Sequence, residues 1–358
     1  MTQTKNKRIV HVVGTGTIGE PLIGLLAAFS KDLGIDEVTF HKRTPLLTDR
    51  SKVLSLERKG ARLAVDEKVR EKFTAMGMTP QYESLDAIDR ASVVIDCTPV
   101  GSENKERLYL QYGQNAHGFI AQGSEFGFGK MYARGVNDAA LRPGVDRFIQ
   151  VVSCNTHNLA VLVDAIGLGP EKENNLEKAH FVCMRRANDL SQEGEFLPSP
   201  EAGKHEDILF GTHQARDAYY LFKTLGLDLN IYSSAMKLNT QYMHVIHFNL
   251  RLKRAVMLDD VIQRLRANPR VALTQKKLTS LVFSFGRDHG LFGRILNQTV
   301  VPIQTIAVKD GKEVIGFAFT PQDGNSLLSS IAAAEWFLYP ESYDQRLKCL
   351  ESCFFEEI

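Results

Sequence analysis

The first half of the chain alternates short apolar runs with segments of helical periodicity. The apolar runs predict strands over residues 8–13, 37–41, 91–97, 118–122 and 148–153. Residues 17–29 carry apolar side chains at the spacing of one helix face. Near-continuous apolar strands separated by helices indicate a parallel sheet that is covered on both faces. The pattern therefore predicts an N-terminal α/β domain.

The second half has longer apolar stretches with turns between them. They predict strands over residues 180–186, 229–238, 243–252 and 301–308, and helices over residues 206–225 and 259–267. This order is typical of an α+β domain with an antiparallel sheet backed by helices. The last segment, residues 326–354, is helical and is expected to return to the first domain. We predict a first domain over residues 1–153, completed by residues from about 323 to 358, and a second domain over residues 154–322.

Composition and charge narrow the classes of function. The 358 residues suffice for two domains with cores of their own. The net charge is only +1, so neither nucleic acid nor an anionic membrane is an expected partner. No apolar run reaches the roughly 18 residues of a membrane span, and the N-terminus lacks the apolar stretch of a signal peptide, so we expect a cytoplasmic protein. Five cysteines without paired spacing predict neither a disulfide framework nor a metal site.

Three glycines stand in G-x-G-x-x-G spacing between a predicted strand and a predicted helix. Gly14 permits a tight turn, Gly16 lets the backbone approach a pyrophosphate, and Gly19 lets the helix pack closely on the strand. The phosphates are expected at the helix N-terminus, near the N–H groups of Thr17 and Ile18. A Rossmann-type dinucleotide-binding domain is thus predicted. The alternative is a glycine-rich turn without a ligand.

The end of the second predicted strand bears on the choice of cofactor. A site specific for NAD usually places Asp or Glu there, to bind the ribose hydroxyl. This chain has Lys42 and Arg43 instead, and cations suit a 2′-phosphate. We predict NADP as the preferred cofactor, with NAD possible. The alternative is that both are solvated surface charges.

Cys154 lies where the strand over residues 148–153 passes into a helical pattern at residues 159–166. Unpaired N–H groups and the helix dipole favour a thiolate at a helix N-terminus. Such a position can lower the pKa of a cysteine from about 8.5 into the range 3.5–7.5. Cys154 is therefore a candidate nucleophile. The alternative is a small buried packing residue, the usual role of a free cysteine.

Several motifs, in the same order, resemble those of the archaeal-type (type II) phosphorylating glyceraldehyde-3-phosphate dehydrogenases. They are G-T-G-T-I-G at residues 14–19, D-C-T-P at 96–99, Q-G-S-E at 122–125, V-S-C-N-T at 152–156, R-R-A-N-D at 185–189, M-H at 243–244, D-D-V-I at 259–262 and P-R-V at 269–271. The cysteine motif alone is also similar to that of aspartate-semialdehyde dehydrogenases; the double arginine and the M-H pair make the set more specific. The resemblance implies a homotetramer whose second domain is catalytic.

The resemblance also implies a reaction that the residues can support. The Cys154 thiolate would attack the aldehyde carbon of glyceraldehyde 3-phosphate, hydride would pass to NAD(P), and inorganic phosphate would release the resulting thioester as an acyl phosphate. A base is needed for the hydroxyl proton, and histidine suits neutral pH. His244 and His247 lie three apart on a predicted strand and so point to opposite faces. The resemblance assigns the catalytic position to His244.

Further residues are expected to bind cofactor or substrate. The predicted cofactor-binding residues are Gly14, Gly16, Thr17, Ile18, Gly19, Lys42, Arg43, Thr98, Pro99, Gly123, Arg186 and Gln322, with Asn325 as a further candidate for the nicotinamide amide. The predicted substrate-binding residues are Ser153, Asn155, Arg185, Lys204 and His205. The two neighbouring arginines should diverge, one binding substrate phosphate and the other reaching the cofactor or an acidic partner. The alternative is an ion pair with Asp189 or with a neighbouring subunit.

The loop over residues 203–207, G-K-H-E-D, departs from the family's S-H-H-G-P-D. Lys204 keeps a positive charge for phosphate, but Glu206 would repel it, so the exact sugar phosphate stays open. His157 replaces a threonine of the family motif and receives no role. Two alternatives remain: another semialdehyde or acyl-phosphate dehydrogenase, such as an aspartate-semialdehyde or acetylglutamyl-phosphate type, and a catalytically inactive NADP-sensing protein. The altered loop favours the second; the retained Cys154 and His244 oppose it.

Overall fold

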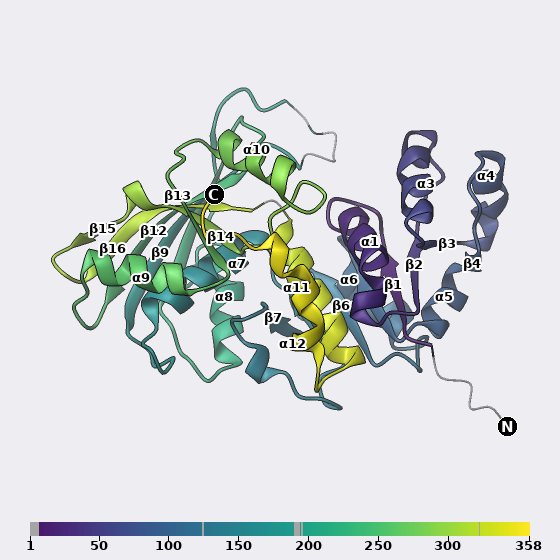
Figure 1. The fold of residues 1–358 in the computed structure, drawn as a ribbon, viewed down its shortest axis with the longest axis horizontal. Coiled ribbons are helices and arrows are strands. Elements are labelled where there is room, and N and C mark those ends of the chain that lie inside the picture. The colour runs from purple at the N-terminus through teal and green to yellow at the C-terminus, as the bar shows by residue number, and fades with distance from the viewer. Residues whose placement is uncertain (1–6, 124, 190–193, 195, 322) are drawn as a thin grey trace. The chain divides into compact units, whose positions relative to one another are not determined.

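The computed structural model describes residues 7–123, 125–189, 194, 196–321 and 323–358 (Figure 1). By its internal contacts the chain divides into two compact units. The first unit comprises Met1–Lys130, Arg142–Val151 and Ser329–Glu351, and the second comprises Met131–Leu141, Val152–Leu328 and Ser352–Ile358.

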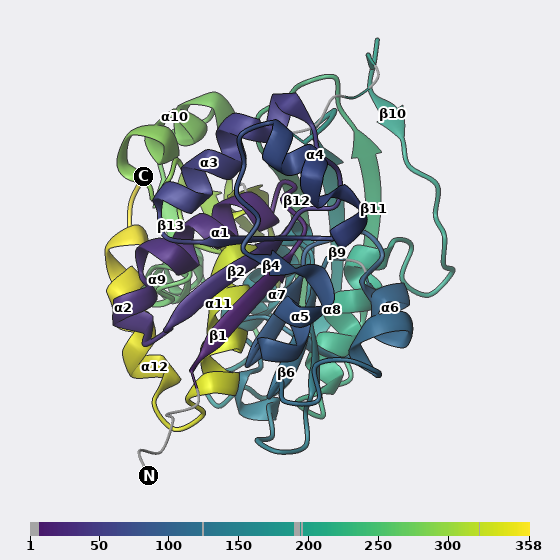
Figure 2. The same cartoon turned by 90° about the vertical axis from the view of Figure 1, so that its right-hand side faces the viewer.

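The first unit is built on a parallel sheet with the strand order β4-β3-β2-β1-β5-β6-β8. In chain order these strands are β1 (Ile9–Val13), β2 (Glu37–His41), β3 (Arg62–Val65), β4 (Tyr82–Glu83), β5 (Val93–Asp96), β6 (Gly118–Gln122) and β8 (Phe148–Val151). In Figure 2, β1 and β2 run side by side. Every residue of β1, β5 and β6 is buried, which requires cover on both faces and accounts for their unbroken apolar runs. The predicted parallel-sheet domain is confirmed.

Short helices connect these strands. They are α1 (Gly19–Ala28), α2 (Ser30–Leu33), α3 (Arg50–Arg58), α4 (Arg70–Ala75), α5 (Ser84–Arg90) and α6 (Gly101–Asn104). The first segment of the unit ends within the short strand β7 (Lys130–Tyr132). Near the C-terminus, helix α11 (Gly324–Leu338) begins in a segment of the second unit and ends in one of the first.

The second unit contains a mixed sheet with the strand order β10-β11-β9-β12-β16-β14-β13, and β15 pairs with β16 (Figure 1). The strands are β9 (Leu176–Arg185), β10 (Glu201–Ala202), β11 (Ile231–Lys237), β12 (His244–Leu252), β13 (Val271–Thr274), β14 (Thr299–Pro302), β15 (Ala307–Lys309) and β16 (Glu313–Thr320). The helices α7 (Cys154–Leu162), α8 (His213–Lys223), α9 (Leu258–Ala267) and α10 (Thr279–His289) accompany it. The predicted α+β arrangement is confirmed.

The prediction of a wholly antiparallel sheet needs correction. β12 is antiparallel to β9 and to β16, but β11 is parallel to β9, and β13 is parallel to β14. The physical reason is connectivity: the chain passes through α8 between β9 and β11, and through α10 between β13 and β14. Helical crossovers of this kind return a strand in the same direction.

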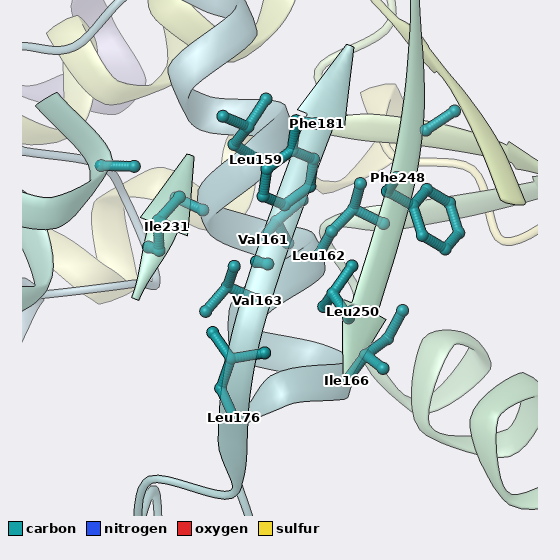
Figure 3. Close-up of a cluster of buried hydrophobic side chains, with 14 of the residues drawn as sticks. Leu159, Val161, Leu162, Val163, Ile166, Leu176, Phe181, Ile231, Phe248 and Leu250 are labelled. Carbon is teal, nitrogen blue, oxygen red and sulfur yellow. The ribbon is translucent and has the colours of Figure 1, made fainter. Parts of the chain in front are cut away.

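The core of the second unit lies between α7 and one face of this sheet. Leu159 and Leu162 from α7 meet Phe181 from β9 and Phe248 and Leu250 from β12, all fully buried (Figure 3). On β12 the buried residues alternate with partly exposed ones, as expected for a sheet with one face in the core. α7 is thus held rigidly, and its first residue is Cys154.

Three predicted elements differ from the structure. The strand expected over residues 301–308 is split, because β14 ends at Pro302, and a 3₁₀ turn over Ile303–Thr305 precedes β15. The helix expected from residue 206 begins only at His213. The C-terminal helix ends at Leu338, close before Pro340, and is followed by α12 (Tyr343–Arg346) and a 3₁₀ segment over Leu347–Cys353. None of the helices in the described part of the chain has the length and apolar character of a bilayer crossing.

Candidate active site

The turn between β1 and α1 holds the three motif glycines in different surroundings. Gly14 has a φ of +95°, a conformation that favours glycine. A Cβ added at Gly19 would lie 2.1 Å from the carbonyl oxygen of Gly14, whereas one at Gly16 would meet no atom within 4 Å. Gly19 therefore serves packing, and Gly16 leaves open space beside the backbone. Thr17 precedes the N-cap residue Ile18, and no side-chain hydrogen bond caps α1 there.

A cavity of about 740 Å³ opens beside this turn, lined entirely by residues of the first unit. Its size lies within the range of cofactor pockets, roughly 300–1,000 Å³. Of the predicted cofactor-binding residues, the lining includes Gly14, Lys42, Arg43, Thr98 and Pro99, but not Gly16, Thr17, Ile18, Gly19 or Gly123. The sequence analysis missed His11, His41, Asp66, Lys68, Ser84 and Arg107, which also line it.

The two cations after β2 differ in their surroundings. Lys42 is 8% exposed, and its Nζ donates to Oδ2 of Asp49 at 2.5 Å. Burial tends to raise the pKa of Asp49, but the hydrogen bond and charge of Lys42, together with Lys52, outweigh it and lower that pKa. Arg43 is exposed at the cavity. Lys42 is thus engaged within the protein, while Arg43 is the cation that faces solvent.

A buried carboxylate fixes the loop after β5. Asp96 is fully buried and accepts hydrogen bonds from the main-chain N–H and the hydroxyl of Thr98, from Asn104 and from the Tyr109 hydroxyl, at 2.6–2.8 Å. These donors hold Thr98 at the wall of the cavity. This loop carries the D-C-T-P motif of residues 96–99, in which Thr98 and Pro99 are predicted cofactor-binding residues. Gly123, at the end of β6, has a φ of +71°.

In the second unit, Cys154 is the first residue of α7 and is partly exposed. The preceding Ser153 is the N-cap, and its Oγ accepts the main-chain N–H of Thr156. The amide of Asn325 donates to the carbonyl oxygen of Cys154 at 2.9 Å. The predicted position of the cysteine at the start of a helix is confirmed. His157 is fully buried, and its Nδ1 bonds to the carbonyl oxygen of Ser153.

A helix N-terminus can lower the pKa of a cysteine, but the surroundings of Cys154 act in the opposite direction. Burial raises the pKa of Cys154 to about 11, the charge of Arg186 opposes that rise, and the carboxylates of Asp323 and Asp189 add to it. The thiol form is therefore stable at neutral pH in the protein alone. The position at a helix N-terminus does not by itself offset the loss of hydration.

His244, the first residue of β12, has a defined protonation state. Burial lowers its pKa to about 3, and the charges of Arg186 and Arg185 contribute, so the ring is neutral. Its Nδ1 accepts the main-chain N–H of Arg186 at 3.0 Å. A neutral ring that accepts at Nδ1 carries its proton on Nε2. His247 lies on the other face of β12, with its ring 5.1 Å from that of Phe317.

Hydrogen bonds connect the position of His244 to the first turn of α7. In the sheet register His244 stands opposite Thr320 of β16. The Thr320 hydroxyl donates to Oδ1 of Asn155 at 3.1 Å and lies 3.0 Å from the amide nitrogen of Asn158. The charges of Arg186 and Asp189 act on both Cys154 and His244. The structure therefore brings the cysteine, the histidine and Arg186 into one neighbourhood.

The two arginines are only partly paired. Arg186 is 6% exposed, and its Nη2 donates to Oδ1 of Asp189 at 2.6 Å, the ion pair named above as an alternative. The Nε atoms of Arg185 and Arg186 are buried, and neither has a hydrogen-bond partner among the residues that the structure describes. Buried guanidinium N–H groups without acceptors favour an anion nearby.

Lys204 and His205, both predicted to bind substrate, lie in the loop between β10 and α8. His205 forms a hydrogen bond with the hydroxyl of Ser234 at 3.1 Å and packs beside Tyr232, and Lys204 is exposed. The charges of Glu206, in the altered loop, and of Arg185 both act on His213, which links this loop electrostatically to the arginine pair. His213 is not among the residues predicted from the sequence. Gln322 lies outside the described residues. Within the described part of the chain, no cluster of three or more His, Cys, Asp or Glu side chains is arranged to hold a metal ion.

Comparison with known proteins gives a consistent set of relatives. No protein-family model matches the chain. It is 28% identical over 295 residues to the glyceraldehyde-3-phosphate dehydrogenase of Archaeoglobus fulgidus, covering 78% of each chain. It is 28% identical over 319 residues to that of Methanobacterium bryantii, covering 85% of this chain and 86% of the relative, and 28% over 318 residues to that of Methanopyrus kandleri, covering 84% of each. The predicted resemblance to the archaeal type is confirmed.

Proposed function

We propose that this chain, an oxidoreductase of the archaeal glyceraldehyde-3-phosphate dehydrogenase type, oxidises glyceraldehyde 3-phosphate with NAD(P) and inorganic phosphate to an acyl phosphate. The observation that carries this proposal is the grouping of Cys154, neutral His244 and the incompletely paired Arg186 at the start of α7. The relatives support the choice of substrate. We further propose a cytoplasmic homotetramer in which residues 1–153 and about 323–358 bind the cofactor and residues 154–322 carry the catalysis.

The residues of the first unit fit a dinucleotide. Gly16 leaves space where a side chain would stand, and the first turn of α1 is uncapped by any side chain, as a pyrophosphate requires. Thr98 and Pro99 line the adjoining cavity. Bound NAD(P) supplies the hydride acceptor. NADP is the preferred cofactor in this proposal, with Arg43 as the contact of its 2′-phosphate, because Lys42 is already paired with Asp49.

In the chemistry, the thiol of Cys154 loses its proton to solvent, the sulfur forms a bond to the aldehyde carbon, and the carbonyl π bond breaks so that its oxygen becomes an alkoxide. The proton on Nε2 lets His244 donate a hydrogen bond to that oxygen. We therefore assign His244 a donor role in place of the expected base. After hydride loss the acyl group is a thioester on Cys154, and an oxygen of inorganic phosphate displaces the sulfur. Arg185 and Arg186 are placed to bind the anionic groups.

Steady-state kinetics test the proposal. With NADP, glyceraldehyde 3-phosphate and inorganic phosphate, the protein should form reduced cofactor, and Cys154→Ser should reduce kcat by at least about 10⁴-fold, because a hydroxyl is a far weaker nucleophile. Cys349→Ser, outside the site, is the matched control and should keep the rate. An unchanged rate in Cys154→Ser would refute the nucleophile. A rate independent of added phosphate would exclude the phosphorylating reaction.

A further inference from the structure

A second cavity lies elsewhere in the second unit, and no role above accounts for it. It has a volume of about 390 Å³ and is lined by the end of the α7 segment, the loop before β9 and the end of α9. Its polar lining includes Asp164, Lys172, Arg264, Asn268 and Arg270. Asp164 follows Cys154 by ten residues in one helical segment, which places their backbones about 15 Å apart at 1.5 Å per residue. The cavity is therefore separate from the cysteine site.

The charges around this cavity are unbalanced. The buried carboxylate of Asp164 pairs with Nζ of Lys172 at 2.6 Å and with Nη2 of Arg270 at 2.5 Å. Arg264, the third cation, forms no ion pair with any described residue. The lining thus contains three cations and one carboxylate, and its formal charge is positive. Such a surplus raises the local concentration of anions.

Hydrogen bonding is incomplete at the same place. The Nη1 atoms of Arg264 and Arg270 are both buried, and neither has a partner among the described residues. A charged donor that is removed from water without an acceptor is destabilising. The planar guanidinium group matches the oxygens of phosphate in geometry. A small rotation of either side chain toward the cavity would offer the unpaired N–H to a bound oxyanion.

We infer that this cavity binds a small, multiply charged oxyanion, either inorganic phosphate or a phosphate monoester. Arg264 and Lys172 are its main contacts, and Asp164 holds Arg270 in place. The volume is at the small end of ligand pockets, which excludes a dinucleotide. The inference does not depend on the proposed catalytic function, because none of these residues takes part in it.

Titration calorimetry at fixed low ionic strength tests the inference, with inorganic phosphate and glycerol 3-phosphate as probes in separate arms. The proteins are the unaltered chain, Arg264→Gln, the double variant Lys172→Gln/Arg264→Gln, and Arg266→Gln as the control. Arg266 is an exposed cation of the same helix that does not line the cavity. Arg264→Gln should raise the Kd about tenfold and the double variant more, since charge-assisted hydrogen bonds are lost. Arg266→Gln should leave the Kd within about twofold of that of the unaltered chain, because a solvent-exposed charge away from the cavity is largely screened.

The proposed phosphate contacts at Arg185 and Arg186 give a second binding event that none of these variants alters. The variants should therefore weaken only one of the two binding events, and kcat/KM should stay unchanged. Tighter binding of glycerol 3-phosphate than of phosphate would identify the ligand as an ester, and the reverse would identify it as the inorganic ion. Equal isotherms for the unaltered chain and the double variant, with either probe, would overturn the inference. So would an equal loss in Arg266→Gln.

Discussion

Two helices of this protein, one in each unit, begin after a buried strand, and their first turns are built differently. α1 follows β1 through a turn with Gly14 and Gly16, and no side chain caps it. α7 follows β8, and its N-cap Ser153 takes up the main-chain N–H of Thr156. The first helix thus begins without a side-chain cap, whereas in the second the N-cap side chain binds one main-chain donor and the first residue carries a thiol.

The difference shows that a helix N-terminus does not determine the chemistry by itself. The dipole is favourable to negative charge in both helices. At Cys154, however, burial and the carboxylates of Asp323 and Asp189 outweigh the charge of Arg186, so the thiol keeps its proton. The groups around the first turn therefore decide whether a helix N-terminus stabilises a negative charge. The four predictions below test this contrast.

The largest effect is expected at His244. His244→Ala should lower kcat/KM by at least about 100-fold, the usual loss when a donor to an oxyanion is removed. His244→Gln keeps a side-chain N–H and should retain activity to within about tenfold of the unaltered enzyme. Measured kcat/KM values for glyceraldehyde 3-phosphate decide the matter. If Gln is as poor as Ala, the histidine acts as a base and the assigned donor role is wrong.

The raised pKa of Cys154 predicts a steep pH dependence of its alkylation. The thiolate is the reactive form, and a pKa of about 11 leaves it scarce at neutral pH, so reactivity is gained as the pH rises. The rate of reaction with iodoacetamide should increase about tenfold per pH unit between roughly pH 7 and 10. Mass spectrometry of the peptide containing Cys154 measures it. Arg186→Gln should lower the rate further, whereas a plateau below pH 8 would mean that the helix N-terminus dominates.

The glycine turn before α1, the first of the two helices compared, offers a matched pair of variants. Gly16→Ala places a methyl group in open space, so thermal stability should be unchanged while the Kd for NADP rises about tenfold, because the pyrophosphate loses its approach. Gly19→Ala drives a Cβ into the carbonyl oxygen of Gly14 and should destabilise the fold by several kcal/mol. Tm and cofactor titration separate the two effects. Equal Kd values for Gly16→Ala and the unaltered chain would remove the anion site from α1.

Much of the fold could be predicted from periodicity, and the failures have physical causes. β1, β5 and β6 were found because strands buried on both faces give nearly continuous apolar runs. β4, with two residues, is too short to give a pattern. The parallel pairing of β11 with β9 could not be deduced from either strand, because it depends on the path of the chain through α8.

For the candidate site, the sequence predicted where Cys154 and His244 lie in the fold better than it predicted their protonation states. The junction of strand and helix placed Cys154 correctly, and the period of two separated His244 from His247. The direction of the pKa shift at the thiol could not be predicted from position alone, because it depends first on burial and then on charges from distant segments, such as that of Asp323. The tautomer of His244 could not be predicted from the sequence either. It is set by the main-chain N–H of Arg186, 58 residues away, and the side-chain types in a sequence do not indicate such main-chain contacts.

The smallest predicted effect isolates the cap that distinguishes the two helices. Ser153→Ala removes the acceptor of the Thr156 N–H and should lower the free energy of unfolding by about 1 kcal/mol, measured by urea denaturation. Ser153→Thr keeps the hydroxyl and should restore most of that loss, which a mere change of side-chain volume would not do. Because Ser153 is also a proposed substrate contact, stability rather than activity is the decisive readout. If Ser153→Ala is as stable as the unaltered chain, α7 does not depend on its cap, and the contrast with α1 then lies in the glycines alone.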